Sequence, residues 1–69
     1  MNFSEAKVAL DNNQRVRRKH WPKTSYLFLQ PDKRRKHLMR RNVRDGVEDI
    51  IMGAMLYWEE LSAENWEVV

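Results

Sequence analysis

Cationic side chains crowd two short segments, residues 15–21 and 33–41, with aromatic side chains in and beside the first, and these are the groups best suited to chemistry. Dense lysine and arginine neutralise phosphate charge, and a guanidinium group can hold a phosphate through two parallel hydrogen bonds. Trp21, Tyr26 and Phe28 lie in or beside the first segment, and aromatic faces stack nucleobases for ~1–3 kcal/mol each. This combination predicts that the protein binds an anionic, nucleotide-like partner.

The same residues also have interpretations of other kinds. Trp21 and Phe28 are of the types that fill a core, and clustered charges often form no more than a solvated face. The second segment is alternatively a surface that contacts the phosphates of a nucleic acid. This candidate surface comprises Lys33, Arg34, Arg35, Lys36, Arg40 and Arg41.

Catalytic and metal-binding groups are not expected. The sequence has no cysteine, which excludes a thiol nucleophile and thiolate metal ligands. Its two glycines, Gly46 and Gly53, do not form a phosphate-binding loop. His20 and His37 are too few for a zinc site without a carboxylate cluster beside them. We therefore expect a binding protein with no catalytic residue, no metal and no cofactor.

Charge is divided unevenly along the chain. Of the 13 Lys and Arg residues, 12 lie within residues 15–44, where Asp32 is the sole acid. Residues 45–69 contain seven acids and no Lys or Arg. This division favours an electropositive surface that attracts anions, or a contact between the basic part of one subunit and the acidic part of another. In a third interpretation, the two parts fold onto each other and neutralise their charges.

Length sets further limits. The 69 residues suffice for one domain, residues 1–69, which hides only about 60% of the surface of its unfolded chain. Without disulfides or a metal, self-association is the usual remaining source of stability, so we expect a homo-oligomer. No stretch approaches the ~18 apolar residues of a membrane span, and the acidic start lacks the apolar run of a secretory signal. A cytoplasmic protein without a membrane partner is expected.

Local patterns predict an α+β fold, in which a small antiparallel sheet packs with an N-terminal helix and a second helix in the C-terminal half. The first helix is expected over Ser4–Asn12, with Ser4 as its N-cap. Pro31 and Asp32 are expected to form the turn after the second strand. Strands are expected over residues 14–21, 25–30 and 66–69, the first two as an antiparallel pair.

The segment Val47–Leu61 has two interpretations. A stripe of apolar residues at helical spacing favours a single amphipathic helix. The stripe contains Val47, Ile50, Ile51, Ala54, Met55, Trp58 and Leu61. The alternative is a strand followed by a shorter helix, because Asp45 and Gly46 together make a favourable hairpin turn. The periodicity favours the single helix.

Both ends of the chain resemble one known family. Residues 1–10, 16–21 and 26–29 resemble its opening, and Glu60–Val69, with the sequence ELSAENWEVV, resembles its closing segment. The family is the second Thoeris anti-defence family of small phage and prophage proteins. The resemblance covers a little over half of the chain, and neither motif is catalytic.

The resemblance implies an α+β domain that assembles into a homotetramer in the cytoplasm of an infected bacterial host. It also implies that the protein sequesters a cyclic nucleotide immune signal, glycosyl cyclic ADP-ribose or a cyclic oligonucleotide, without cleaving it. The residues that match the family's basic and aromatic strand are Arg17, Arg18 and Trp21, with Tyr26 on the neighbouring strand. By their chemistry, the two arginines would hold phosphates while the two aromatic rings stack a base or ribose.

The centre of the chain, Pro31–Trp58, departs from the pattern of the family. Residues 33–41 are far more basic than in a typical member, and a changed centre is consistent with a changed target. The alternative function is therefore a nucleic-acid-binding protein, or an inhibitor of a nucleoprotein immune complex similar to an anti-CRISPR protein. Either would act through Lys33–Arg41.

Overall fold

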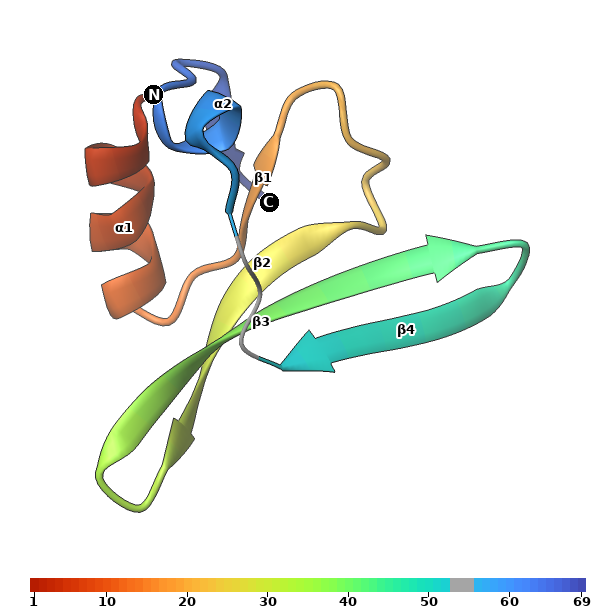
Figure 1. Cartoon of the computed structure of the whole chain (residues 1–69), viewed down its shortest axis with the longest axis horizontal. Helices are drawn as coiled ribbons and strands as arrows, with labels where there is room; N and C mark the ends of the chain where they lie inside the picture. The colour runs from red at the N-terminus through yellow and green to blue at the C-terminus, as the bar shows by residue number, and fades with distance from the viewer. Residues whose placement is uncertain (53–55) are drawn as a thin grey trace.

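The computed structural model describes residues 1–52 and 56–69, which form two helices and five strands (Figure 1). The strands make one antiparallel sheet in the order β4-β3-β2-β1-β5. The predicted α+β fold, a small antiparallel sheet with two helices, is confirmed. The elements are α1 (Phe3–Asp11), β1 (Val16–Arg18), β2 (Tyr26–Asp32), β3 (Arg35–Arg44), β4 (Val47–Met52), α2 (Trp58–Leu61) and β5 (Trp66–Val68).

Helix α1 begins earlier than predicted because Asn2, and not Ser4, is its N-cap. Asn2 Oδ1 accepts a hydrogen bond from the backbone N–H of Glu5 at 2.9 Å, and Glu5 Oε1 accepts one from the N–H of Asn2 at 3.0 Å. This reciprocal capping box pairs two amide groups at the start of the helix that would otherwise lack a partner. The buried face of α1 consists of Ala6, Ala9 and Leu10.

Strands β1 and β2 form the predicted antiparallel pair, but with different bounds. Strand β1 is shorter because the chain turns after Arg18, whose carbonyl accepts a hydrogen bond from the N–H of Trp21 at 3.0 Å. The turn predicted at Pro31 and Asp32 is wrong, since both residues continue β2 and pair with β3. A proline is tolerated near the end of a strand where its missing N–H is not needed. Residues 33–34 make the turn instead.

The single helix predicted over Val47–Leu61 is also wrong, because β4 and α2 occupy its two ends. Asp45 has φ 54° and Gly46 has φ 77°. Two successive residues of positive φ are typical of a type I′ turn, whose twist matches that of the strands beside it. The turn pairs β4 with β3 along six residue pairs. Ala54 and Met55, from the predicted apolar stripe, lie outside the described residues.

The core lies between α1 and the part of the sheet formed by β1, β2 and β5. Trp66 is 1% exposed, and its ring centroid lies 5.4 Å from that of Phe3 and 5.5 Å from that of Trp21. Its indole N–H donates to the carbonyl oxygen of Glu60 at 2.9 Å, so the buried ring has no unpaired polar atom. Leu27 in the middle of β2 is fully buried.

Two hairpins extend beyond this core. Figure 1 shows the tips of the β2–β3 and β3–β4 hairpins pointing in different directions, both away from the helices. The accessible surface is 5240 Å², against about 4,600 Å² expected for a monomeric protein of 8.4 kDa. Neither helix of the described residues has the length and hydropathy that a membrane crossing needs.

We expect Leu27→Ala to lower the free energy of unfolding by about 2–5 kcal/mol, because it removes buried contacts and leaves a cavity. Urea denaturation followed by tryptophan fluorescence measures the loss. Val8→Ala is the matched control, since Val8 is 61% exposed on α1 and its truncation should change stability by less than about 0.5 kcal/mol. Equal losses in the two variants would contradict this assignment of the core.

Candidate functional site

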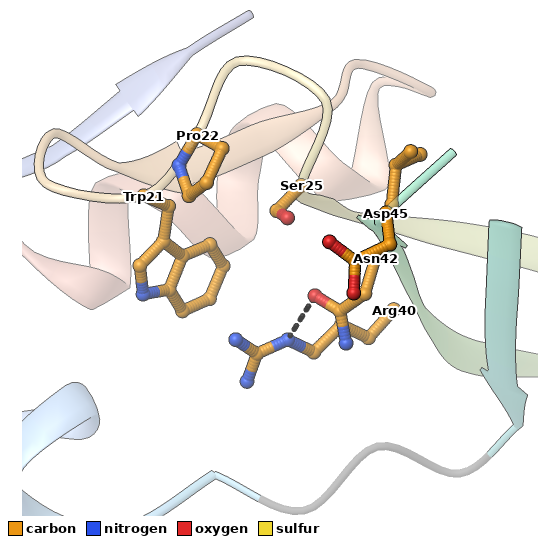
Figure 2. Close-up of a pocket in the computed structure, with 7 residues that line it drawn as sticks. Trp21, Pro22, Ser25, Arg40, Asn42 and Asp45 are labelled. Carbon is orange, nitrogen blue, oxygen red and sulfur yellow. Dashed lines mark hydrogen bonds between the residues drawn. The ribbon is translucent and has the colours of Figure 1, made fainter. Parts of the chain in front are cut away.

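A hollow of about 460 Å³ lies where the loop between β1 and β2 meets β3 and the β3–β4 turn (Figure 2). Its volume is within the range of about 300–1,000 Å³ that is typical of small-molecule sites. Figure 2 shows side chains of the loop on one side of the hollow and side chains of β3 on the other. The lining residues are Trp21, Pro22, Ser25, Arg40, Asn42, Val43 and Asp45.

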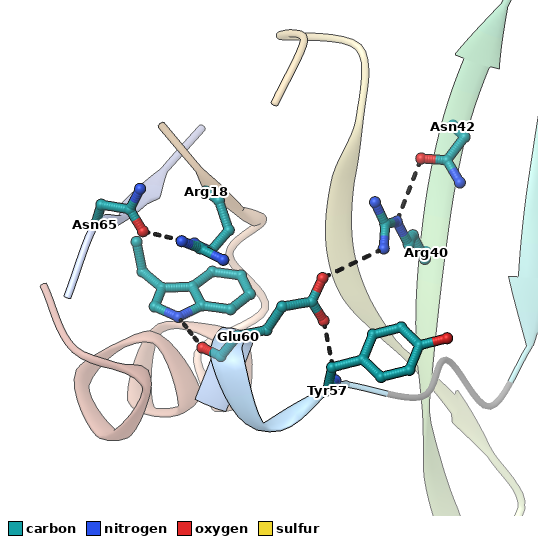
Figure 3. Close-up of polar contacts among 7 residues, drawn as sticks. Arg18, Arg40, Asn42, Tyr57, Glu60 and Asn65 are labelled. Atoms are coloured by element: carbon teal, nitrogen blue, oxygen red, sulfur yellow. Dashed lines mark hydrogen bonds and ion pairs between the residues drawn. The ribbon is translucent and has the colours of Figure 1, made fainter. Parts of the chain in front are cut away.

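The contact between Arg40 and Trp21 is central to the hollow. The guanidinium carbon of Arg40 lies 4.2 Å from the centroid of the Trp21 ring, which is a cation–π arrangement. Arg40 Nε donates to Asn42 Oδ1 at 3.3 Å, and Arg40 Nη1 lies 3.8 Å from Glu60 Oε1 (Figure 3). The Arg40 side chain is 27% exposed. The guanidinium is therefore held in position and still accessible to an anion.

Trp21 owes its position to the core. Its ring meets that of Trp66 edge to face, and its carbonyl oxygen accepts a hydrogen bond from Arg17. The residue is 8% exposed, and Arg40 lies over its ring. Trp21 thus holds the Arg40 guanidinium in place and offers little free aromatic face to a ligand.

Polar groups that sequence reasoning did not single out complete the lining. Ser25 contributes a hydroxyl, Asn42 an amide and Asp45 a carboxylate. These groups can donate to or accept from ribose hydroxyls and base edges, while Arg40 suits a phosphate. The sequence carried a weak signal for one pair, because Arg40 and Asn42 are two residues apart and so share one face of a strand. Arg40 itself was predicted only as part of a nucleic-acid surface.

Arg17 and Arg18, predicted to hold phosphates, are engaged within the chain. Arg17 forms an ion pair with Glu67, its partner on β5, in addition to its hydrogen bond to the Trp21 carbonyl. Arg18 Nε donates to Asn65 Oδ1 at 2.5 Å (Figure 3). Of the four predicted ligand residues, Trp21 is the one that lines the hollow.

Tyr26, the fourth, lies on the other face of the sheet, since its neighbour Leu27 faces the core. Arg15 and Arg41 each donate to its hydroxyl at 3.5 Å, and their guanidinium carbons lie 5.0 and 5.5 Å from its ring centroid. Arg41 Nε also lies 3.2 Å from Glu48 Oε1. The hydrogen bond from Arg15 lowers the pKa of Tyr26; burial opposes this in part, and Arg41 adds to the lowering.

The predicted nucleic-acid surface is divided among three places. Lys33, Arg34, Arg35 and Lys36 lie exposed at the tip of the β2–β3 hairpin. A second hollow, of about 510 Å³, is lined by Lys33, Arg34, Arg35 and His37. Arg40 and Arg41 lie farther along β3, on opposite faces of the sheet, beside Trp21 and Tyr26 respectively. The tip therefore forms a basic cluster separate from the two arginines.

We expect Arg15→Gln to raise the pKa of Tyr26, because it removes the hydrogen bond that lowers it. An alkaline absorbance titration measures this in a Tyr57→Phe background, where Tyr26 is the single tyrosine. Because the pKa of Tyr26 is lower in the folded protein than in the unfolded chain, the contribution of this group to the free energy of unfolding should rise with pH between the lowered pKa and about 10. Lys19→Gln, outside this cluster, should leave the pKa unchanged. An unchanged or lower pKa in Arg15→Gln would contradict the assignment.

The whole chain matches one family model, which describes the Thoeris anti-defense 2-like domain and aligns with residues 1–69. The match spans the central segment Pro31–Trp58 as well as the two ends. Neither the curated proteins nor the solved structures gave a match. The predicted resemblance is confirmed, and the chain belongs to the Thoeris anti-defense 2-like family.

Proposed function

We propose that this anti-defence domain binds and sequesters a cyclic nucleotide immune signal, without cleaving it, in the cytoplasm of a phage-infected bacterium. The proposed ligand is glycosyl cyclic ADP-ribose or a cyclic oligonucleotide. The anti-defence role comes with the family. The observation that carries the ligand class is the hollow of about 460 Å³ in which Arg40 is held on Trp21.

Arg40 is the proposed phosphate contact. A guanidinium has five N–H donors, and Asn42 uses one of them. The distance of 3.8 Å to Glu60 is too long for a hydrogen bond, so a phosphate can compete for the donors on that side. The cation–π contact with Trp21 holds the guanidinium in place before the ligand arrives, which reduces the entropy lost on binding.

The nucleoside part of the ligand would contact the remaining lining. The Asp45 carboxylate can accept hydrogen bonds from ribose hydroxyls, and the Ser25 hydroxyl can donate or accept. Pro22 and Val43 supply apolar surface beside these groups. A pocket that combines apolar walls with a few convergent polar groups is typical of small-molecule sites.

The other predicted ligand residues fit this proposal only with a second subunit. Arg17 borders a separate hollow of about 270 Å³, and Tyr26 lies on the opposite face of the sheet from Trp21. One subunit therefore does not bring Arg17, Arg18, Trp21 and Tyr26 to one ligand. All four side chains could contact one ligand only if some of them came from a second subunit.

We propose that the protein is a homo-oligomer, a homotetramer by its resemblance to the family. Trp58 is 77% exposed, Tyr57 70% and Ile50 53%. Large aromatic side chains are enriched at protein–protein interfaces. The accessible surface above that expected for a monomer of this mass supports the same conclusion.

Native mass spectrometry with a panel of cyclic nucleotides tests the ligand class. We expect whole ligand molecules to add to a defined oligomer, and ligand released by heating to be unchanged in mass. Arg40→Gln should weaken binding about 10–100-fold, since a hydrogen bond to a charged group contributes about 1.5–3 kcal/mol. Lys7→Gln, which removes an exposed cation of α1, is the control of equal charge and should bind as the parent does. Binding of no cyclic nucleotide, or cleaved products, would contradict the function.

Multi-angle light scattering tests the oligomer. Trp58→Gln should shift the protein toward smaller species, because it removes a large apolar contact and leaves a good helix former at that position. Val8→Gln changes a similarly exposed apolar residue on α1 and should leave the mass unchanged. A monomeric parent protein at micromolar concentration would contradict the proposal, and an unchanged mass of Trp58→Gln would exclude Trp58 from the interface.

A further inference from the structure

The β2–β3 hairpin continues as a two-stranded arm beyond the core. Leu29 and Leu38, which face each other across the hairpin, pack against the edge of the core. Three more residue pairs follow toward the tip, about 10 Å of two-stranded ribbon. In Figure 1 this tip projects past the end of α1. The arm therefore offers its turn and its outer face to a partner, while on its inner face Lys36 lies beside α1.

Positive charge is concentrated at the tip of this arm. Lys33, Arg34, Arg35 and Lys36 are consecutive and exposed. The side chains of Arg34, Arg35 and Lys36 form no hydrogen bond or ion pair among the side chains that the structure describes. The cations elsewhere on the sheet differ, since each of three arginines has a glutamate partner: Arg17 with Glu67, Arg40 with Glu60, and Arg41 with Glu48.

Stability of the fold does not account for this cluster. Like charges held side by side on a hairpin repel each other and destabilise it. Of the tip residues, Lys36 lies beside the core, since it lines a hollow of about 280 Å³ with Phe3, Leu10 and Leu38. The hollow beside Arg34 and Arg35 has no core residue among the described residues that line it. An anionic partner with several closely spaced charges would convert the repulsion into a favourable interaction.

The shape and composition of the arm favour double-stranded DNA among polyanions. A two-stranded β-ribbon fits the B-form major groove, about 12 Å wide, whereas the major groove of A-form RNA is too narrow. Residues 33–36 include no aromatic side chain, so the stacking that binds single strands is lacking at the tip. They include no apolar residue either, and an anchor in a membrane interface needs one.

We propose that the β2–β3 arm enters the major groove of B-form duplex DNA and binds its phosphates through Lys33, Arg34, Arg35 and Lys36. The contacts are to phosphates, so binding is independent of base sequence, with a dissociation constant in the range of about 10⁻⁴–10⁻⁶ M at physiological salt. The proposal concerns a different surface from the hollow at Trp21 and does not depend on nucleotide sequestration.

Fluorescence anisotropy with a labelled 20-base-pair duplex tests the proposal. Four phosphate contacts predict a slope of log K against log salt of about −3.6, a loss of about 100-fold between 50 and 200 mM KCl. The double variant Arg34→Gln/Arg35→Gln should bind at least about 10-fold more weakly and have a slope shallower by about 2. The control Lys19→Gln/Lys23→Gln has the same net charge, with both exposed cations removed from the β1–β2 loop. The dissociation constant of this control variant for the duplex should stay within about 2-fold of that of the parent.

Three results would overturn the proposal. Equal losses in the tip and control variants would mean that net charge, and not the arm, attracts the DNA. Tighter binding to a single strand of the same length, or to vesicles of phosphatidylcholine and phosphatidylserine, would assign the tip to another partner. If the parent protein shows no salt-dependent binding to the duplex, the proposal is wrong. Arg40→Gln should leave duplex binding within about 2-fold of the parent, so this proposal and the proposed function can fail separately.

Discussion

Burial of Trp66 is the interaction on which both the fold and the candidate site depend. Its ring contacts Phe3 of α1 and Trp21 of the β1–β2 loop, and its indole N–H donates to the carbonyl of Glu60. One side chain near the C-terminal end therefore joins the first helix, the loop and α2. Since Trp21 in turn carries Arg40, the cation of the hollow is positioned by the hydrophobic core and not by charges alone.

The cations of this small domain fall into three physical classes. Some stabilise the fold, as Arg17 does with Glu67. Others lie over aromatic rings with a glutamate nearby, as Arg40 does at Trp21. A third group faces solvent at the hairpin tip. The acidic C-terminal part of the chain thus neutralises part of the basic centre within one subunit, and the densest group of remaining exposed cations lies at the tip.

Sequence patterns identified those parts of the fold in which local and tertiary preferences agree. Helix α1 and strand β5 combine suitable local residues with burial, and both lie close to where they were predicted. The region after Asp45 failed because its apolar spacing suits a helix while its turn demands a hairpin. Ile50 and Ile51 are about half exposed, so burial of a helical apolar stripe does not determine whether these residues form a helix or a strand. The left-handed turn and its ladder of pairs decide it instead.

The candidate site was predictable only in part, for a related reason. Trp21 and the importance of guanidinium groups followed from residue types. The meeting of Trp21 with Arg40 depends on the β2–β3 register, which places Arg40 opposite Leu27 and hence on the core side of the sheet. That register is set by the turn at residues 33–34, whereas sequence patterns predict the turn at Pro31 and Asp32. Arg41, one residue further, lies on the opposite face for the same reason.

Strand β3 contributes to the basic tip at one end and to the hollow at the other. Successive side chains of a strand point to opposite faces, so a slip of one residue against β2 would exchange Arg40 for its neighbours at the hollow. Insertions or deletions inside β3 are therefore incompatible with the site. Residues 33–34 form an exposed turn, where added residues leave the pairing of the strands intact. Residues added at this turn would thus lengthen the arm while the geometry around Trp21 stays constant.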